Sequence, residues 1–330
     1  MFHTFFASKK WFAWAWLGAI MVVAATWYKV ELDVQINVWF GSFYDMLQKA
    51  LATPNSVEFE ELLGKMFEFA RIAGVYIVIA VILDYFLRHF VFRWRTAMND
   101  YYTANWHVVR HIEGASQRIQ EDTMRFARIM ETLGVALLRS VLTLIAFLPI
   151  LWGLSEHIQV LPWVGEVPHA LVFLALFSAI CGTVLLAVVG IKLPGLEFNN
   201  QMVEAAYRKE LVLGEDSAER ADPPTLDNLY ANVRKNYFRL YLHYFYFDIA
   251  KWSYLQFSVV FPYIAMGPTI VAGAFTLGVM QQIVRAFGKV EESFQFLVNS
   301  WGTIVELISI YKRLHAFDKQ INELKDAAKA

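Results

Sequence analysis

The stretch that decides the fold class is ALVFLALFSAICGTVLLAVVGI, residues 170–191. It contains no charged residue, and it is long enough to cross the roughly 30 Å apolar core of a bilayer, for which a helix needs about 20 residues. Lipid offers the backbone no hydrogen-bond partners, so a spanning segment of this kind pairs its peptide groups within a helix. The stretch therefore predicts a membrane-spanning helix.

Five further apolar stretches have a similar length: 11–28, 69–89, 133–155, 248–271 and 280–310. The last two contain ionisable residues. The composition agrees, because 57% of the residues are hydrophobic and 18% are charged, against roughly a quarter in soluble domains. The sequence predicts an all-α integral membrane protein with six transmembrane helices in the lipid bilayer. The net charge of −1 gives no sign of a nucleic-acid partner.

Lysine and arginine residues are unevenly distributed among the connections. The connection 156–169 has none, whereas the segment before the first helix, the connections 93–132 and 192–237 and the C-terminal tail are all basic. By the positive-inside rule the basic segments lie in the cytosol, and both termini lie there with them. The run 11–28 is longer than the apolar part of a signal peptide, so we expect it to be retained.

The two long basic connections have helical periodicity and predict helical hairpins over 93–132 and 192–237. The second has its turn at Asp222-Pro223-Pro224. Six spans joined by two long cytosolic hairpins in these positions are the layout of the ABC-exporter membrane domain. We expect one transmembrane transporter domain over 1–318, followed by a cytosolic tail over 319–330. This analogy concerns the fold and does not fix the function.

Several local motifs in nearly the whole chain resemble the SbmA/BacA family of peptide transporters. They are Val91-Phe-Arg-Trp-Arg-Thr-Ala-Met98, the run from His111 to Phe126, Val189-Gly-Ile-Lys-Leu-Pro-Gly-Leu-Glu-Phe198, Val203-Glu-Ala-Ala-Tyr-Arg-Lys-Glu-Leu211, Val233-Arg-Lys-Asn-Tyr-Phe238 and Tyr311-Lys-Arg-Leu314.

This resemblance implies uptake of peptides and peptide-like compounds, including antimicrobial peptides, across the bacterial inner membrane. It implies a homodimer with an ABC-exporter-like fold that is driven by the proton gradient and has no ATPase domain. Familiar members begin with a further membrane segment, whereas here 1–8 lead almost directly into the first helix.

Two other classes of protein remain as alternatives. No Gly-x-x-x-x-Gly-Lys-Ser/Thr loop occurs, and the chain ends soon after Leu314, so we expect no fused ATPase domain. The membrane subunit of an ATP-driven ABC transporter with a separate ATPase subunit is therefore the main rival. A membrane enzyme is the third reading, but no nucleophile–base or metal constellation supports it. His107 and His111 have metal-ligand spacing without a further ligand nearby, and we expect neither a metal nor a cofactor.

Glutamates on the hairpins are the candidates for proton coupling: Glu121, Glu131, Glu197, Glu204 and Glu215. The last three are two and three helical turns apart and share one face of a continuous helix. Glu113 and Glu131 are five turns apart and also share a face. The family's proton pathway is thought to run along glutamates in this region, and Glu131, Glu204 and Glu215 sit at matching points. The alternative is that these acids are solvated charges on wet helices.

We expect Glu131 and Glu204 to converge near a shared cytosolic cavity, where burial beside a like charge favours proton uptake. Glu210, on a different face from Glu204, should tolerate neutralisation.

Charged residues in the sixth span are candidates for the substrate cavity. Arg285, Lys289 and Glu292 recur at i, i+4 and i+7, on one stripe inside the bilayer, where charges normally face water or form pairs. The alternative is a local pair of Lys289 with Glu292. Asp84 with Arg88 and Asp248 with Lys251 have the spacing of structural pairs.

Trp39, Tyr44 and Asp45 extend the first helix past the membrane. The family motif suggests that they line the outward mouth. An interfacial aromatic belt explains the rings equally well.

Overall fold

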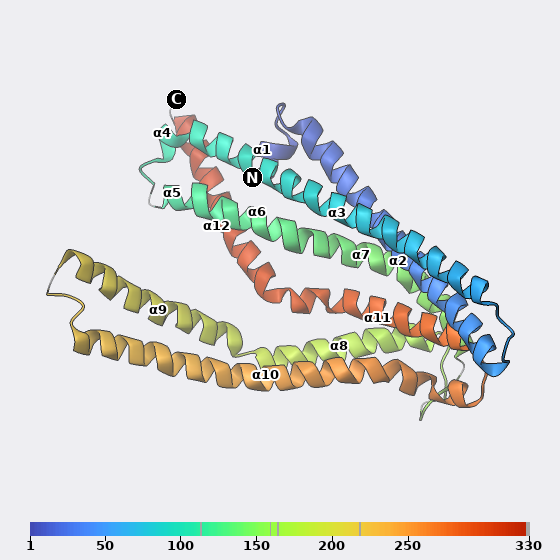
Figure 1. Cartoon of the computed structure of the whole chain (residues 1–330). Coiled ribbons are helices and arrows are strands. Elements are labelled where there is room, and N and C mark those ends of the chain that lie inside the picture. The colour runs from blue at the N-terminus through green and yellow to red at the C-terminus, as the bar shows by residue number, and fades with distance from the viewer. Residues whose placement is uncertain (113, 159, 164, 218, 328–330) are drawn as a thin grey trace. The chain divides into compact units, whose positions relative to one another are not determined.

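The protein is built almost entirely of helices, which confirms the all-α membrane class (Figure 1). The computed structural model describes residues 1–330 except 113, 159, 164, 218 and 328–330. The described chain forms two compact units. Unit 1 is Met1–Leu176 with Pro262–Ala330, and unit 2 is Phe177–Phe261. Each unit is described by itself below.

Unit 1 contains the first three long helices and the last two. Its elements are α1 (Phe2–Phe6), α2 (Phe12–Ala52), α3 (Phe59–Ala104), α4 (Trp106–Val109), α5 (Ala115–Gln117), η1 (Arg118–Asp122), α6 (Thr123–Ile129), η2 (Met130–Gly134), α7 (Val135–Leu154), η3 (Ser155–His157), β1 (Val160–Leu161), β2 (Gly165–Glu166), α11 (Leu277–Asn299) and α12 (Trp301–Ala327). The strands β1 and β2 are antiparallel, with Val160 opposite Glu166.

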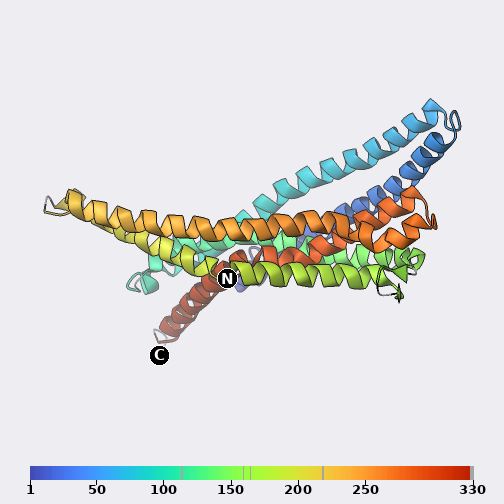
Figure 2. The same cartoon turned by 90° about the horizontal axis from the view of Figure 1, so that it is seen from below.

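Unit 2 consists of three helices, of which the last runs antiparallel to the first two. The helix α8 (Ala170–Gly190) enters it from unit 1, α9 (Leu193–Asp216) follows, and α10 (Pro223–Val271) returns alongside both (Figures 1 and 2). The Tyr254 hydroxyl donates to the Ser178 carbonyl at 3.2 Å, and Asn236 Nδ2 donates to Asn200 Oδ1 at 3.1 Å. These contacts join α10 to α8 and to α9.

Five described helices are long and apolar enough to cross a membrane, namely α2, α3, the helical run Ala115–His157, α8 and α10. Large apolar side chains on them are exposed, as expected for surfaces that face lipid; Leu17, Phe67 and Val188 are examples. The predicted sixth span differs from the structure, because α11 and α12 meet within it, at Ser300, where the chain changes direction (Figure 1). Whether α11, with its charges, crosses the membrane stays a prediction.

Both predicted hairpins are present, each within its own unit. In the first, α3 continues to Ala104, and Gly114 adopts φ 76° as the chain turns toward α5. Two π-helical segments, η1 and η2, interrupt the returning leg, which the 3.6-residue periodicity did not predict. In the second, the turn was predicted at Asp222-Pro223-Pro224, but it ends before the prolines, because α10 begins at Pro223. The Thr225 N–H donates to Asp222 Oδ2 at 3.3 Å, an N-cap contact. Hydrogen bonds from Thr225 lower the pKa of the Asp222 carboxyl.

An aromatic core holds the first hairpin of unit 1 together. Trp94 of α3 lies 5.2 Å from the Phe126 ring of α6 and 5.9 Å from the Phe5 ring of α1. Tyr102 of α3 lies 5.4 Å from Phe317 of α12. All five side chains are buried. This core fixes α3, α6 and α12 next to one another.

A close antiparallel seam joins α2 to α11. The Gly278 N–H donates to Asp45 Oδ1 at 2.9 Å, and the Leu277 N–H donates to Gln48 Oε1 at 2.7 Å. Two of the N–H groups that a helix leaves free at its start are thus satisfied by α2. A Cβ added at Gly278 would collide with the Gly41 carbonyl, so the absence of a side chain allows this approach. The seam sets which side chains of α11 meet α2.

Candidate functional site

Asp33 on α2 is the centre of a charged cluster inside unit 1. Its side chain is only 12% exposed. Lys289 Nζ of α11 lies 3.6 Å from Oδ1, and an Arg139 terminal nitrogen of α7 lies 3.6 Å from Oδ2. Both distances are longer than a good hydrogen bond, so the attraction is mainly electrostatic. The acid of α2 therefore lies between one cation from α7 and one cation from α11.

A polar cavity of about 210 Å³ lies beside this cluster, between α7 and α11. The cavity is lined by two cations, Arg139 and Lys289, by one acid, Glu292, and by small polar groups. The other lining residues are Ala136, Ser140, Thr143, Ser293, Phe296 and Asn299. A cavity with both signs of charge suits a ligand that itself has a carboxylate and an amine.

Lys289 and Glu292 therefore both reach the cavity, but the described residues show no ion pair between them. Lys289 pairs with Asp33 instead, and Glu292 is exposed. The alternative of a local structural pair is wrong for Lys289, because the seam brings α2 within reach of it.

Arg285 lies one turn before Lys289, against the ring of Phe40. Its guanidinium carbon is 4.0 Å from the ring centroid. Its Nε is buried and has no hydrogen-bond partner in the part of the chain that the structure describes; the same holds for Oδ1 of Asn37. The stripe of Arg285 and Lys289 thus faces α2 and not solvent.

The predicted mouth residues of α2 have different surroundings from each other. Trp39 is buried, donates from Nε1 to the Lys65 carbonyl at 2.9 Å, and stacks on Phe43 at 4.6 Å. Asp45 caps α11 through Gly278. Tyr44 is half-buried, with its ring 5.9 Å from Phe40. Trp39 and Asp45 are occupied in packing α2 against its neighbours.

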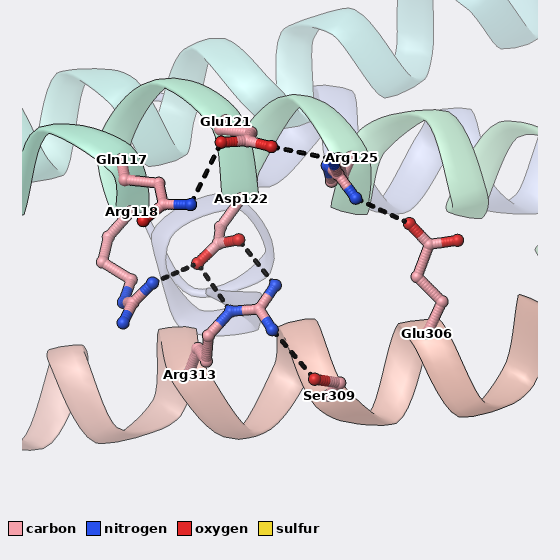
Figure 3. Close-up of polar contacts among 8 residues, drawn as sticks. All are labelled: Gln117, Arg118, Glu121, Asp122, Arg125, Glu306, Ser309 and Arg313. Carbon is pink, nitrogen blue, oxygen red and sulfur yellow. Dashed lines mark hydrogen bonds and ion pairs between the residues drawn. The ribbon is translucent and has the colours of Figure 1, made fainter. Parts of the chain in front are cut away.

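The glutamates of the first hairpin lie among cations. Arg125 contacts Glu121 at 2.7 Å and Glu306 of α12 at 3.4 Å (Figure 3). Glu131 lies 3.6 Å from Arg88 of α3. Arg88 was predicted to pair with Asp84, and the described residues show no such pair. Glu113 lies outside the described residues, and the π-helical segments change the angular spacing on which its shared face with Glu131 depended.

A neighbouring contact closes the first hairpin onto α12. The buried Asp122 accepts two hydrogen bonds from Arg313, at 3.0 Å from Nε and 2.7 Å from a terminal nitrogen (Figure 3). Arg118 donates to Asp122 at 3.2 Å. The hydrogen bond to this carboxylate raises the pKa of the Arg313 guanidinium, which stays charged at any pH the protein meets.

The glutamates of unit 2 lie along α9 in unlike environments. The Tyr244 hydroxyl donates to Glu197 Oε1 at 2.7 Å. Glu204 is half-exposed, and no described cation lies within 4.0 Å of it; Glu215 is exposed. Glu210, which was predicted to tolerate neutralisation, accepts a hydrogen bond from the Ala221 N–H at 3.2 Å and lies 3.7 Å from Arg220. Glu131 and Glu204 belong to different units, and their convergence stays a prediction.

Sequence reasoning missed Asp33 and Arg139. Arg139 stands inside the apolar run 133–155, and an ionisable residue within a predicted span is a signal that was available. Asp33 follows the predicted end of the first span and gave no such signal. Asp248 and Lys251, predicted to pair, have no ion pair within the described residues.

Comparison with curated proteins finds relatives of low identity along most of the chain. The Escherichia coli (strain K12) protein "Inner membrane ABC transporter ATP-binding protein YddA" is 23% identical over 322 residues, which cover 90% of this chain and 56% of that protein. A Synechocystis protein, "Uncharacterized ABC transporter ATP-binding protein sll0182", is 25% identical over 95% of this chain and 47% of its own length. The chain spans about half the length of these curated relatives.

The apolar helices, together with relatives that are named as parts of ABC transporters, indicate a multi-pass membrane protein. The model of the SbmA/BacA-like family matches residues 8–322. The chain belongs to the SbmA/BacA-like family.

Proposed function

We propose that the protein is a homodimeric importer of peptides and peptide-like compounds in the bacterial inner membrane, driven by the proton gradient, with both termini in the cytosol. The observation that supports the proposal best is the charged cluster of Asp33, Arg139 and Lys289 beside a polar cavity within a bundle of apolar helices. Charges in such a position are costly and usually serve a pathway for polar substrates.

The cavity offers groups for both ends of a peptide. Arg139 and Lys289 would hold a carboxylate, and Glu292, which is exposed toward the cavity, would hold an amine. An arriving carboxylate competes with Asp33 for the same two cations. Binding would thereby weaken the link that Asp33 makes between α2, α7 and α11, so substrate and helix arrangement would be coupled.

Proton coupling is assigned to Glu131 and Glu204 in this proposal, with Glu121, Glu197 and Glu215 as further candidates. Within unit 1 the groups near Glu131 are arginines and not the like charges first expected. Its protonation would release Arg88, and this would change the ion pairing between α3 and η2. Glu204 has no ion pair within the described residues, so its carboxylate is the better candidate for a coupling acid that no cation holds.

One observation favours a second candidate, the membrane part of an ATP-driven transporter. The relatives named above are described as ATP-binding proteins, and they are about twice as long as the matched region. Under this alternative, transport would need nucleotide and an ATPase supplied by another chain or region.

Uptake of a fluorescent peptide into vesicles that contain only the purified protein separates the two candidates. An imposed inward proton gradient without nucleotide should drive uptake, and a protonophore should abolish it. The ATP-driven transporter would be supported instead if uptake needs ATP and an added ATPase subunit and does not depend on the proton gradient.

Variants of the two glutamates test the coupling. Glu131→Gln and Glu204→Gln should reach the membrane and lose most gradient-driven uptake. The matched control is Glu219→Gln, an exposed acid in the turn of the same hairpin as Glu204. Glu210 is unsuitable as a control, because its carboxylate holds Ala221 and Arg220 in that turn. Normal uptake with both Glu131 and Glu204 neutralised would contradict the assignment.

A further inference from the structure

A groove of about 660 Å³ separates the two legs of the first hairpin of unit 1, outside the charged cluster described above. One wall is α3, with Arg88, His89 and Arg95. The other wall is formed by α6 and η2, with Arg128 and Glu131. The remaining lining residues are Val91, Phe92, Met124, Ala127 and Thr132.

The charges in this groove are unbalanced. Three arginines face a single carboxylate, that of Glu131, which lies 3.6 Å from Arg88. Neither Arg95 nor Arg128 has a carboxylate within 4.0 Å in the described parts of the chain. Guanidinium groups bind phosphate through paired, charge-assisted hydrogen bonds. The groove therefore has two arginines free to hold an anion of the phosphate type.

The groove lies where each leg passes from apolar to charged sequence. On α3 the apolar span 69–89 ends at Arg88 and His89, and on the other leg Glu131 and Thr132 directly precede the apolar run 133–155. Arg95 lies only about 10 Å further along α3, at 1.5 Å per residue. The headgroup layer beside the apolar core is roughly 5–8 Å thick. Arg88 and Arg128 are thus at the depth of lipid phosphates, and Arg95 lies just beyond that layer, where its long side chain can reach back toward it.

The groove also has apolar side chains at the same depth. Phe92 is 63% exposed and Met124 is 39% exposed, on opposite walls. A soluble anion makes no use of such side chains, whereas the glycerol and upper acyl carbons of a phospholipid pack against them. The combination of cationic and apolar side chains on both walls matches an amphipathic anion.

We propose that this groove binds the phosphate headgroup of an anionic phospholipid through Arg88, Arg95 and Arg128. The lipid phosphate competes with Glu131 for Arg88, so its arrival frees the Glu131 carboxylate from its ion pair. Basic pockets between membrane helices are a known type of headgroup site. The binding itself is independent of what the protein transports.

Native mass spectrometry of the purified chain in detergent tests the proposal, with phosphatidylglycerol and phosphatidylcholine of identical acyl chains as probes. Phosphatidylglycerol should be retained at least about tenfold more tightly than phosphatidylcholine, because its headgroup has a net negative charge that attracts each arginine. In phosphatidylcholine the choline ammonium group offsets the charge of the phosphate. The combined change Arg88→Gln, Arg95→Gln and Arg128→Gln should remove this preference. Millimolar inorganic phosphate should leave the lipid bound.

The matched control removes the same number of cations elsewhere in the hydrophilic part of unit 1, through Arg110→Gln, Lys312→Gln and Lys319→Gln, and should keep the preference. Arg128→Gln alone, at an exposed arginine without an ion pair, should lower the preference about threefold with unchanged thermal unfolding. An unchanged preference in the groove variants overturns the proposal. So does an equal loss in the control, which indicates diffuse attraction, or displacement by inorganic phosphate, which indicates a free-anion site.

Discussion

Asp33 holds cations from two different helices, and this is the most informative contact at the scale of single residues. Each partner is at 3.6 Å, so neither pair alone is strong. Removing Asp33 leaves Lys289 and Arg139, whose side chains are 24% and 46% exposed, without the carboxylate that both contact. Like charges repel each other, so the acid stabilises the arrangement of the two cations.

We predict that Asp33→Asn and Lys289→Gln are coupled. Each single change should lower the unfolding temperature in detergent, and the double variant should lose less than the sum. The coupling energy should be at least about 0.5 kcal/mol, as for residues in one ion network. Glu292→Gln, at an exposed acid on the same helix, should be additive with Asp33→Asn. Additivity in the first pair would mean that the ion pair contributes nothing.

Asp122 provides a second prediction, for the contact between the hairpin and α12. Asp122→Asn should lower the free energy of unfolding by about 1–3 kcal/mol, because a buried carboxylate that accepts from Arg313 and Arg118 is lost. Glu121→Gln, whose pair with Arg125 is half-exposed, should cost at most about 1 kcal/mol. Denaturant titration of both variants gives the comparison, and equal losses would contradict it.

At this scale the sequence predicted the stripe on α11 but not its partner. The spacing of Arg285, Lys289 and Glu292 shows which residues share a face, and this is a local property. That Asp33 meets Lys289 depends on how α2 packs, and no local pattern contains it. For the same reason the sequence did not predict that the Trp39 indole contacts Lys65 and Phe69 of α3; its position at an outward mouth or in an aromatic belt stays a prediction.

At the scale of elements, the sequence predicted where helices occur, but it did not predict where they are interrupted. Asp222-Pro223-Pro224 was predicted as the turn of the second hairpin, and the structure has a turn directly before Pro223, where α10 begins. An aspartate before prolines is also a helix-start signal in the chain itself. The break at Ser300 and the π-helical segments η1 and η2 have no such signal. The segment η1 packs against α3 and α12, and η2 packs against α3, which are contacts between residues far apart in the chain.

The seam between α2 and α11 yields a prediction about elements. Gly278→Ala should destabilise the protein by about 1–3 kcal/mol, because the new methyl group collides with the Gly41 carbonyl and the Asp45 side chain. Gly288→Ala on the same helix meets open space and should be neutral or stabilising by up to about 1 kcal/mol. Thermal unfolding of the two variants measures the difference. Similar values would show that the helices are not in close contact here.

At the scale of the whole molecule, the distribution of lysine and arginine predicts which connections face the cytosol. In a background with Cys181→Ser, we predict that Trp163→Cys reacts with an impermeant thiol reagent added outside intact cells. Trp163 is 94% exposed in the connection without lysine or arginine. Ser217→Cys, in the exposed turn of the second hairpin, should react only after the cells are opened. Labelling of position 217 from outside would reverse the proposed orientation.

The capping of α11 by side chains of α2 has an evolutionary consequence. The start of α11 depends on Asp45 and Gln48, which lie more than two hundred positions earlier in the chain. A substitution at Gly41, Asp45 or Gly278 therefore changes the constraint on the other two, and tolerated changes at these positions should arise together in diverging lineages. In a chimera that takes α2 from one ancestor and α11 from another, the capping side chains and the glycine that allows the close approach would no longer match.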